Sequence, residues 1–249
     1  MTRHILLLCL LGNPFELNLG GHQRTVLEII EHFKDMPRLE ITVITTTKSS
    51  LKQLTPNHLY SNIVLYEIPI KKEWFENQDL LYDNRNFLYE TVKKIYENIK
   101  HPITLVHSTY WISGLLASQL CIEYHLTQIH SVISTSCERK RNGFSPVSSH
   151  QYESEQFFLP KVDRIISITE SEYELLIEKY HIEPHKIIVV GRTVADCFLR
   201  PAHLPSGNLE QDVSVNYNTL ASQDTGWWVN GAFCYIGTVS YTHLTLPTN

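Results

Sequence analysis

Apolar runs alternate with helical periods through the first 190 residues, and this alternation limits the fold more than any other feature of the chain. The apolar runs are expected to be buried strands: Ile5–Leu11, Ile41–Thr45, Ile63–Ile68, Thr104–His107, Gln128–Ser134, Val162–Ile168 and Lys186–Val190. Amphipathic helices are expected between them, at Thr25–Phe33, Asn86–Ile99, Ile112–Tyr124 and Ser171–Tyr180. Strands separated by such helices require right-handed crossovers, which predicts an α/β fold with a doubly wound parallel sheet.

The composition excludes several classes of protein. The chain has 249 residues, of which 43% are hydrophobic, enough to bury a full core. Its net charge of -5 provides no basic field, so no nucleic-acid partner is expected. The five cysteines show no C-x-x-C spacing, which indicates reduced thiols in a cytoplasmic protein. Ile5–Leu11 follows a positive charge as in a signal peptide, but it ends at a Gly-Asn-Pro turn without a cleavage site and is interpreted as a strand.

The segment LLGNPFELNLGGHQRTVLEII places two adjacent glycines, Gly20 and Gly21, directly before an amphipathic helix. Glycines let the backbone approach a ligand closely, and the start of a helix offers unpaired N–H groups with a partial positive charge. This combination predicts an anion site for a phosphate, with a plain tight turn as the alternative. The spacing matches neither the G-x-G-x-x-G fingerprint nor the P-loop, which argues against NAD and nucleoside triphosphates.

A second candidate is the histidine of LVHSTYWISGLLA. His107 is expected where a short strand ends and a loop begins, the edge at which open α/β sheets bind ligands. A histidine there can donate to a hydroxyl or a developing charge, and the rings of Tyr110 and Trp111 can pack against the apolar faces of sugars. The alternatives are a structural histidine and a core tryptophan.

Charged segments supply the third candidate. Residues 138–141 of STSCERKRNGF include Arg139 and Lys140 and form a basic cluster after a strand, suited to a phosphate or an anionic acceptor. A solvated surface loop is the alternative. Two acidic stretches, HQYESEQFF and ITESEYELL, are expected to be helical, and neither requires a catalytic role.

The order of these pieces resembles the N-terminal half of GT-B glycosyltransferases of family 4. The likeness spans residues 4 to 201 and rests on the Gly-Gly-x-x-Arg helix start, the His-x-x-Tyr-Trp-x-Ser-Gly segment and DRIISITESEYELLIEKYHIEPHKIIVVGRTVADCFLRP. One departure is Gly191-Arg192, where the family has Asn-Gly. The resemblance implies a Rossmann-like N-terminal domain that holds the acceptor, followed by a C-terminal domain that binds most of a nucleotide-sugar donor.

The resemblance also implies roles for single residues. Gly20 and Gly21 would approach the donor diphosphate, and His107 would lie beside the transferred sugar as the catalytic residue. Contacts with the sugar or the acceptor would come from His22, Tyr110, Trp111, Arg139 and Lys140. Transfer is expected to retain the anomeric configuration, with the leaving diphosphate stabilised by N–H groups and basic side chains and with no metal or other cofactor.

The end of the chain is expected to belong to a truncated protein. Residues 1–201 would form the N-terminal domain, 202–232 a linker or irregular segment, and 233–238 the first strand of a C-terminal domain, because GAFCYIG resembles the opening strand of that domain. Residues 239–249 resemble a translated adapter of transposase-based sequencing libraries and are excluded from the fold. We therefore expect the intact protein to be an enzyme and the 249-residue chain to be inactive.

Two other functions stay open: a GT-B relative such as a sugar-nucleotide epimerase, and a non-enzymatic ligand-binding α/β module. A paired Glu motif in the second domain would favour a transferase over an epimerase. The acceptor, a glycan, lipid or small molecule, would be selected by the irregular segments Ser49–Asn62 and Lys71–Arg85. The aromatic residues of the second segment are interpreted either as ordinary packing or as a patch for a lipid acceptor, which would bring peripheral membrane association.

Overall fold

The computed structural model describes residues 2–15, 21–34, 36–48, 54–143, 148–191, 227–229 and 232–234. The strands of the main sheet are β1 (Arg3–Cys9), β2 (Leu39–Thr47), β3 (Asn57–Tyr60), β4 (Ile63–Pro69), β5 (Leu105–Thr109), β6 (Gln128–Ser131), β7 (Arg164–Ser167) and β8 (Ile187–Val189). The helices are α1 (Gly21–Phe33), α2 (Lys72–Glu76), α3 (Gln78–Asp83), α4 (Arg85–Glu97), α5 (Trp111–Tyr124), α6 (Ser136–Arg141), α7 (Gln151–Phe158) and α8 (Glu170–Tyr180). Short 3₁₀ turns lie at η1 (Leu159–Lys161) and η2 (Pro184–Lys186).

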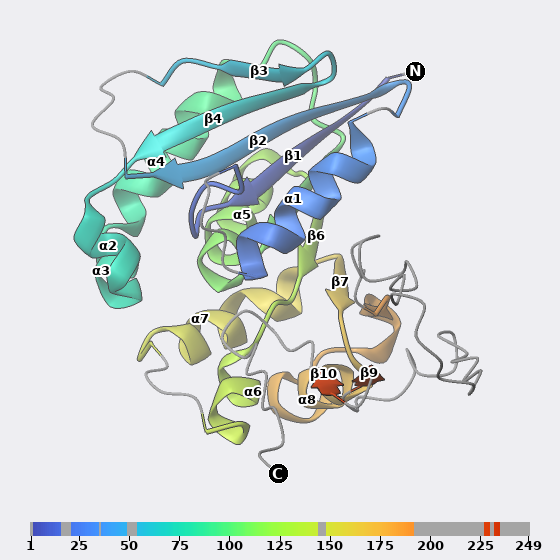
Figure 1. Ribbon diagram of the computed structural model, residues 1–249. Coiled ribbons are helices and arrows are strands. Elements are labelled where there is room, and N and C mark those ends of the chain that lie inside the picture. The colour runs from blue at the N-terminus through green and yellow to red at the C-terminus, as the bar shows by residue number, and fades with distance from the viewer. Residues whose placement is uncertain are drawn as a thin grey trace, which may run out of the picture.

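The eight strands form one sheet in the order β3-β4-β2-β1-β5-β6-β7-β8 (Figure 1). Every neighbouring pair is parallel except β3 with β4, which is antiparallel. The strand order reverses direction between β1 and β5, as in doubly wound folds. The predicted α/β class and parallel sheet are therefore confirmed.

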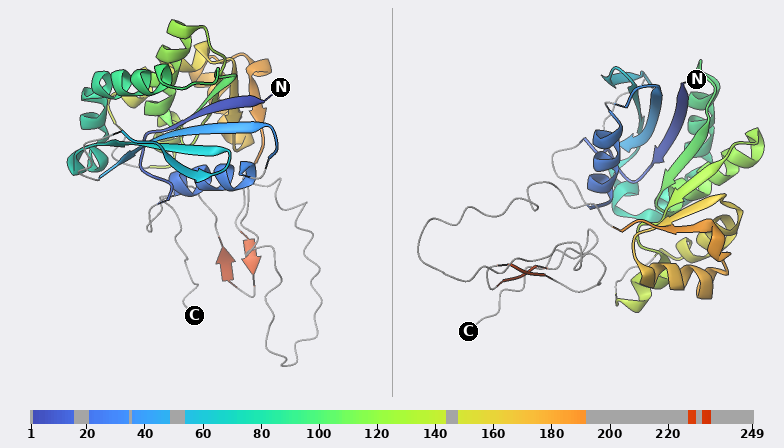
Figure 2. Two further views of the ribbon diagram at one scale, coloured as in Figure 1. Left: turned by 90° about the horizontal axis from the view of Figure 1, so that it is seen from above. Right: turned by 90° about the vertical axis from the view of Figure 1, so that its right-hand side faces the viewer.

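Helices pack on both faces of this sheet because right-handed crossovers to opposite sides place their helices on opposite faces. In β1, Leu7 and Cys9 point into a smaller core that Val26 and Ile30 of α1 complete. Leu6 and the other alternate residues of β1 point into a larger core shared with α4, α5, α7 and α8. Figure 2 shows α1 on one side of the sheet and α4, α5 and α8 on the other.

Threonine caps begin two of the helices on the larger side. Thr135 accepts a hydrogen bond from the N–H of Glu138 at 3.2 Å and starts α6. Thr169 accepts a hydrogen bond from the N–H of Glu172 at 3.1 Å, and the Glu172 carboxylate accepts one from the N–H of Ile168 at 3.2 Å. These caps satisfy helix N–H groups that have no partner within the helix, so the chain turns into a helix directly after β6 and β7.

The segments predicted to be irregular contain regular structure. Residues 49–62 include β3, which adds an antiparallel edge to the sheet, and residues 71–85 form α2 and α3. Of the apolar residues predicted there, Leu81 is buried, while Trp74, Phe75 and Tyr82 pack partly against the larger core and Leu80 is 37% exposed. This arrangement corresponds to the ordinary packing alternative. No helix among the described residues is long and apolar enough to cross a membrane.

Two short strands lie outside the main sheet. β9 (Trp227–Val229) pairs antiparallel with β10 (Ala232–Cys234), with Phe233 opposite Trp228. Of the strand predicted at residues 233–238, residues 233 and 234 belong to β10, and residues 235–238 lie outside the described residues. The partner strand β9 consists of residues that were predicted to be part of a linker. Residues 192–226 and 235–249, including the proposed adapter-derived tail, lie outside the described residues.

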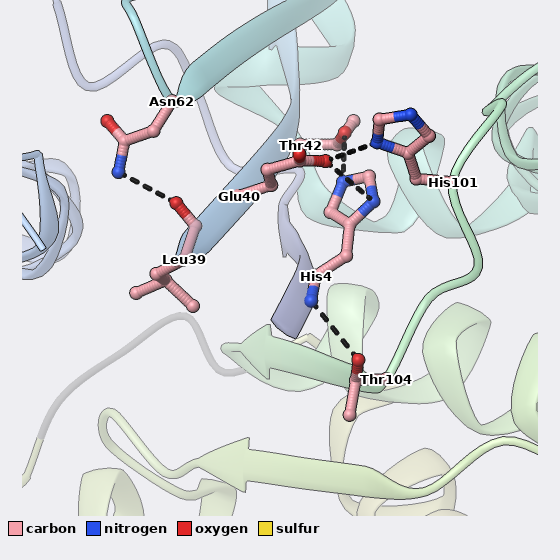
Figure 3. A network of polar contacts seen from close by, with 7 residues as sticks. All are labelled: His4, Leu39, Glu40, Thr42, Asn62, His101 and Thr104. Carbon is pink, nitrogen blue, oxygen red and sulfur yellow. Dashed lines mark hydrogen bonds and ion pairs between the residues drawn. The ribbon is translucent and has the colours of Figure 1, made fainter. Parts of the chain in front are cut away.

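A polar cluster occupies the amino ends of the strands (Figure 3). The Oε2 atom of Glu40 on β2 lies 2.7 Å from Nδ1 of His101 and 3.8 Å from Nδ1 of His4 on β1. The other ring nitrogen of His4 lies 2.9 Å from the Thr42 hydroxyl, and its backbone N–H donates to the Thr104 hydroxyl at 3.1 Å. This cluster joins β1 to β2 and to the segment before β5 at the end of the sheet opposite the candidate site.

Candidate functional site

The carboxyl ends of β1 and β5 meet the start of α1, at the edge where doubly wound sheets bind ligands. The loop after β1 is fixed by hydroxyl groups of β2. Thr45 donates to the carbonyl oxygens of Cys9 and Gly12, each at 2.9 Å. Thr46 donates to the carbonyl of Leu10 at 3.0 Å and accepts from the N–H of Gly12 at 3.2 Å. Gly12 has a φ of 104°, which other residues rarely adopt, so this turn requires a glycine.

His22, the second residue of α1, is a buried polar side chain at this edge, with 4% exposure. Its Nε2 atom lies 3.0 Å from the hydroxyl of Thr109, the last residue of β5. Because that hydroxyl donates to the carbonyl of Leu8, it accepts from His22, which leaves Nδ1 as an acceptor. Nδ1 is buried and has no hydrogen-bond partner among the described groups. Burial lowers the pKa of His22 to about 4, so the ring is neutral at pH 7.

His107 lies in the middle of β5 rather than at its end, which corrects the predicted position. The strand continues to Thr109 because Ser108 and Thr109 still pair with β6. It stops before Tyr110, whose φ is 66°. The half-buried ring of His107 places Nε2 2.8 Å from the Ser131 hydroxyl on β6. Burial lowers the pKa of His107 to about 4, so this ring is also neutral near pH 7.

The two histidines belong to one polar cluster. Thr109, the partner of His22, lies opposite Ser131, the partner of His107, in the register of β5 and β6. His107 and Thr109 are two residues apart on one strand and therefore point to the same face of the sheet, the face that α1 covers. The structure thus brings His22 and His107, which were predicted separately, onto the same sheet face near the start of α1.

Of the two predicted phosphate-binding glycines, Gly21 lies within the described residues and Gly20 does not. Gly21 is the first residue of α1, four residues before the predicted start of this helix, and the following turns carry the predicted amphipathic pattern. Its position places helix N–H groups at the carboxyl edge of the sheet. Gly20 lies outside the described residues. Phosphate binding by this pair stays a prediction.

The aromatic pair that follows β5 is packed into the protein. Tyr110 and Trp111 are 4% and 2% exposed, and both donate to the side-chain oxygen of Gln78 on α3, at 3.1 and 3.2 Å. The Tyr110 ring also lies 5.7 Å from the His22 ring. Trp111 is thus a core residue at the start of α5, which agrees with the alternative prediction of a core tryptophan. Contact of either ring with an acceptor stays a prediction.

The basic cluster forms a short helix, α6, instead of a surface loop, because Thr135 caps it. Its side chains separate. Lys140 lies over the ring of Tyr152 at 5.4 Å, and Arg141 donates to the Ser171 hydroxyl at 2.6 Å. Arg139 is half-buried, and its Nε has no hydrogen-bond partner among the described residues. The structure therefore does not bring the basic side chains together into one patch, and anion binding by Arg139 or Lys140 stays a prediction.

Several residues of this region were not predicted from the sequence. Thr109 and Ser131 lie at or next to predicted strands. Because Thr109 follows His107 by two residues, the two-residue period of a strand could have placed both on the same face. Gln78 gave no signal, because its contacts depend on how α3 folds over the sheet edge. Within the described residues, no group of three or more His, Cys, Asp or Glu could hold a metal ion. The expectation that no metal is needed stays a prediction.

The fold and the site define a class of protein. A mostly parallel sheet, with a polar site where the first strand meets the first helix, is the Rossmann-like architecture of GT-B glycosyltransferase domains. The family description "Glycosyltransferase Family 4" matches residues 19–195, and the chain belongs to this family.

Individual relatives are more distant. A D-inositol 3-phosphate glycosyltransferase of Kineococcus radiotolerans is 28% identical over 101 residues, which are 39% of this chain and 23% of that protein. Sucrose-phosphate synthase from Thermosynechococcus elongatus has a similar fold, with a TM-score of 0.59 and 16% identity over 76% of this chain and 48% of that one. UGT89C1 of Arabidopsis thaliana, solved in complex with UDP, has a TM-score of 0.52 and 11% identity over 77% of this chain and 52% of that one. The chain spans about half the length of these two structures.

Proposed function

We propose that this chain is the acceptor-side domain of a glycosyltransferase that moves a hexosyl or related sugar from a nucleotide-sugar donor to a hydroxyl group of its acceptor. Family membership supports the reaction class, and the UDP complex of a structural neighbour supports a nucleotide donor. The coverage of about half of the solved relatives supports a second domain that would bind most of the donor. The acceptor would be a sugar, a glycan, a lipid or a small molecule.

The observation that carries this proposal is the acceptor atom Nδ1 of His22, which is buried and has no hydrogen-bond partner in the part of the chain that the structure describes. A buried polar atom without a partner costs about 1–3 kcal/mol, so such atoms persist mostly where a ligand or a water satisfies them. Nδ1 of a neutral imidazole can accept a hydrogen bond from a hydroxyl group, which sugars carry and the ionised diphosphate of a nucleotide sugar lacks. We therefore assign His22 to a sugar hydroxyl, and we assign the N–H groups at Gly20 and Gly21 to the donor diphosphate.

His107 would act beside the transferred sugar. Because its ring is neutral near pH 7, it would serve as a hydrogen-bond donor or acceptor rather than as a cation. Transfer would retain the anomeric configuration, with the leaving diphosphate stabilised by backbone N–H groups and basic side chains and without a metal ion. Such a protein would act in carbohydrate biosynthesis in the cytoplasm, at the membrane surface if its acceptor is a lipid.

The test is His22→Ala in the intact protein, in which this chain continues into the second domain. Release of nucleoside diphosphate from a panel of nucleotide sugars is measured with and without acceptor. Loss of one hydrogen bond to a sugar hydroxyl should lower kcat/KM by roughly 10- to 100-fold. The matched control is His185→Ala, because His185 is exposed and distant in sequence from the site, and it should leave kcat/KM unchanged. Equal activity of both variants would remove His22 from the site.

The 249-residue chain alone should transfer sugar negligibly, because a site formed at the edge of one domain lacks the donor contacts of the other. Turnover is measured for this chain and for the intact protein under the same conditions. Turnover by the chain alone at a rate comparable to that of the intact protein would contradict the assignment of the donor to a second domain.

A further inference from the structure

A buried carboxyl group lies in α7, in a stretch to which the sequence assigned no role. Glu155 is 3% exposed. Its two oxygens accept hydrogen bonds from the Ser136 N–H at 3.0 and 3.3 Å, from the side-chain amide of Gln151 at 2.7 Å and from the Tyr180 hydroxyl at 2.5 Å. Burial of a carboxyl group costs free energy unless hydrogen bonds satisfy its oxygens. A buried network that satisfies them makes the surrounding structure more rigid.

Those partners belong to three helices. Ser136 is the first residue of α6, Gln151 is the first of α7 and Tyr180 is the last of α8. The Tyr180 oxygen also accepts from the N–H of Cys137 at 3.3 Å, so the first two N–H groups of α6 end in this network. The carboxyl group of Glu155 thus holds the start of α6 against the two helices that follow it.

The helix that Glu155 holds in place carries Arg139. Glu155 and Thr135, the residue that caps α6, line one small cavity together with Tyr110. Tyr110 directly follows Thr109, and its ring lies 5.7 Å from the ring of His22, so this cavity lies next to the residues that are proposed to bind the sugar. The buried Nε of Arg139, which has no partner among the described groups, points to an unfilled interaction on α6.

We propose that Glu155 is a positioning residue of the acceptor side: its buried carboxyl group fixes α6, and thereby the place of Arg139, next to the cavity that Tyr110 lines. The inference deepens the proposed function and rests on it for the acceptor, while the attachment of α6 can be measured without any reaction. Arg139 would then meet an anionic or hydroxyl group of the acceptor, and Glu155 would act through it without touching the acceptor.

The attachment of α6 should depend on pH. Burial raises the pKa of Glu155 to about 7, although Tyr180, Gln151, Ser136 and Arg139 all favour its ionised form. Opening of α6 would hydrate the carboxyl group and return its pKa toward 4.5, so a rise in pH from 6 to 8 favours opening. The other titratable groups here keep their charge in this range, because burial raises the pKa of Tyr180 and Tyr110 and lowers that of His130 to about 3.

The first test uses the 249-residue chain and the thiol of Cys137 on α6. Alkylation of Cys137 is followed by peptide mass mapping in wild type, Glu155→Gln and Glu153→Gln, the last being an exposed control on the same helix. Dividing the wild-type alkylation rate by the E155Q rate at each pH removes the effect of thiol ionisation, which both proteins share. This ratio should rise at least about fivefold between pH 6 and 8, and E153Q should follow wild type.

A ratio that stays constant with pH would overturn the proposal. If E155Q does not fold, Tyr180→Phe provides the second test, because it removes the bridge between Glu155 and Cys137. That variant should alkylate at Cys137 several-fold faster than wild type at pH 6, and an unchanged rate would also overturn the proposal.

The second test uses the intact protein and separates KM from kcat. In wild type, the KM for the acceptor should rise from pH 6 to 8, whereas in E155Q it should stay flat, with kcat and the KM for the donor changing less than about twofold. A parallel rise of KM in both proteins would contradict a positioning role for Glu155. Absence of turnover in every variant would reject the transferase function, and the alkylation ratio would still decide the role of Glu155.

Discussion

Burial sets the chemistry of single residues in this domain. His22 and His107 are both neutral near pH 7 because their surroundings disfavour the charged ring, and each uses one ring nitrogen to bind a hydroxyl of the sheet. Fixing one nitrogen determines which role is left for the other, so Thr109 and Ser131 orient the two imidazoles. These hydroxyl groups therefore belong to the proposed site together with the histidines that they orient.

Replacing His107 by Ala in the intact protein should lower kcat by at least about 100-fold, because a side chain that stabilises developing charge typically contributes 10²–10⁴-fold. The KM for the donor should change little. Ser131→Ala, which removes the partner of Nε2 but keeps the imidazole, should give a smaller loss. Steady-state kinetics with saturating donor measure both. Unchanged kcat in the alanine variant of His107 would leave it a structural residue of β5.

The sequence indicated the two histidines but not their partners. His22 follows a glycine pair at a helix start and His107 lies in an apolar strand, and both signals are local. Thr109 and Ser131 are paired through the register of two parallel strands, and Glu155 acquires its role only when three helices meet. A local pattern cannot reveal such contacts, because the residues that make them are far apart in the chain.

At the level of elements, the contact between α5 and α7 leaves no spare volume. Gly114 in α5 lies so close to α7 that an added Cβ would stand 2.5 Å from the ring of Phe158 and 2.7 Å from that of His130. The glycine therefore allows the two helices to approach, and His130 packs edge-on against Phe158 at 5.0 Å between their centroids. The position of α7, and with it that of Glu155, depends on this approach.

Gly114→Ala should consequently destabilise the domain, although alanine favours a helix over glycine by about 1 kcal/mol. Overpacking of a tight core costs typically 1–3 kcal/mol, so a net loss of up to about 2 kcal/mol is expected. Urea unfolding of the 249-residue chain measures it. Gln119→Ala, at an exposed position of the same helix, is the control and should change the free energy of unfolding by less than about 0.5 kcal/mol. A stabilised Ala variant would show that α5 and α7 can separate at low cost.

Element prediction succeeded where hydrophobic periodicity is strong. The buried parallel strands and the helices α4, α5 and α8 lie close to their expected positions, because each buries a continuous apolar face. The short elements β3, α2, α3 and α6 were missed. They have few buried residues of their own and are stabilised by caps or by contact with neighbouring elements, such as the pairing of β3 with β4.

For the whole molecule, neutral buried histidines predict sensitivity to acid. Burial lowers the pKa of His4. It also lowers the pKa of His22 and His107 to about 4 and that of His130 to about 3. As the pH falls below 6.5, the unfolded chain takes up protons that the folded chain does not, so the free energy of unfolding decreases toward pH 4. Because burial raises the pKa of Glu155, this residue makes the free energy of unfolding increase as the pH falls from about 7 to 4.5. The four histidines together outweigh this single group.

The temperature of unfolding should therefore be lower at pH 5 than at pH 7, with roughly two to three protons taken up on unfolding at pH 5. Calorimetry in buffers of different ionisation enthalpy measures both quantities. His130→Gln should reduce the proton uptake, whereas His185→Gln, at an exposed position, should not. A higher unfolding temperature at pH 5 would mean that these histidines are charged in the folded protein.

The strand order also implies an order of opening. β1 lies between β2 and β5 and pairs with β2 along its whole length, whereas β8 pairs over three residues with β7 and borders no other strand of the described sheet. Ile188 in β8 is 48% exposed. Amide deuterium exchange should thus be slowest in β1 and should quicken through β6 and β7 toward β8. The half of the domain that carries α6 and α8 would then be the half that fluctuates, and under the proposed function this is the half that would admit an acceptor.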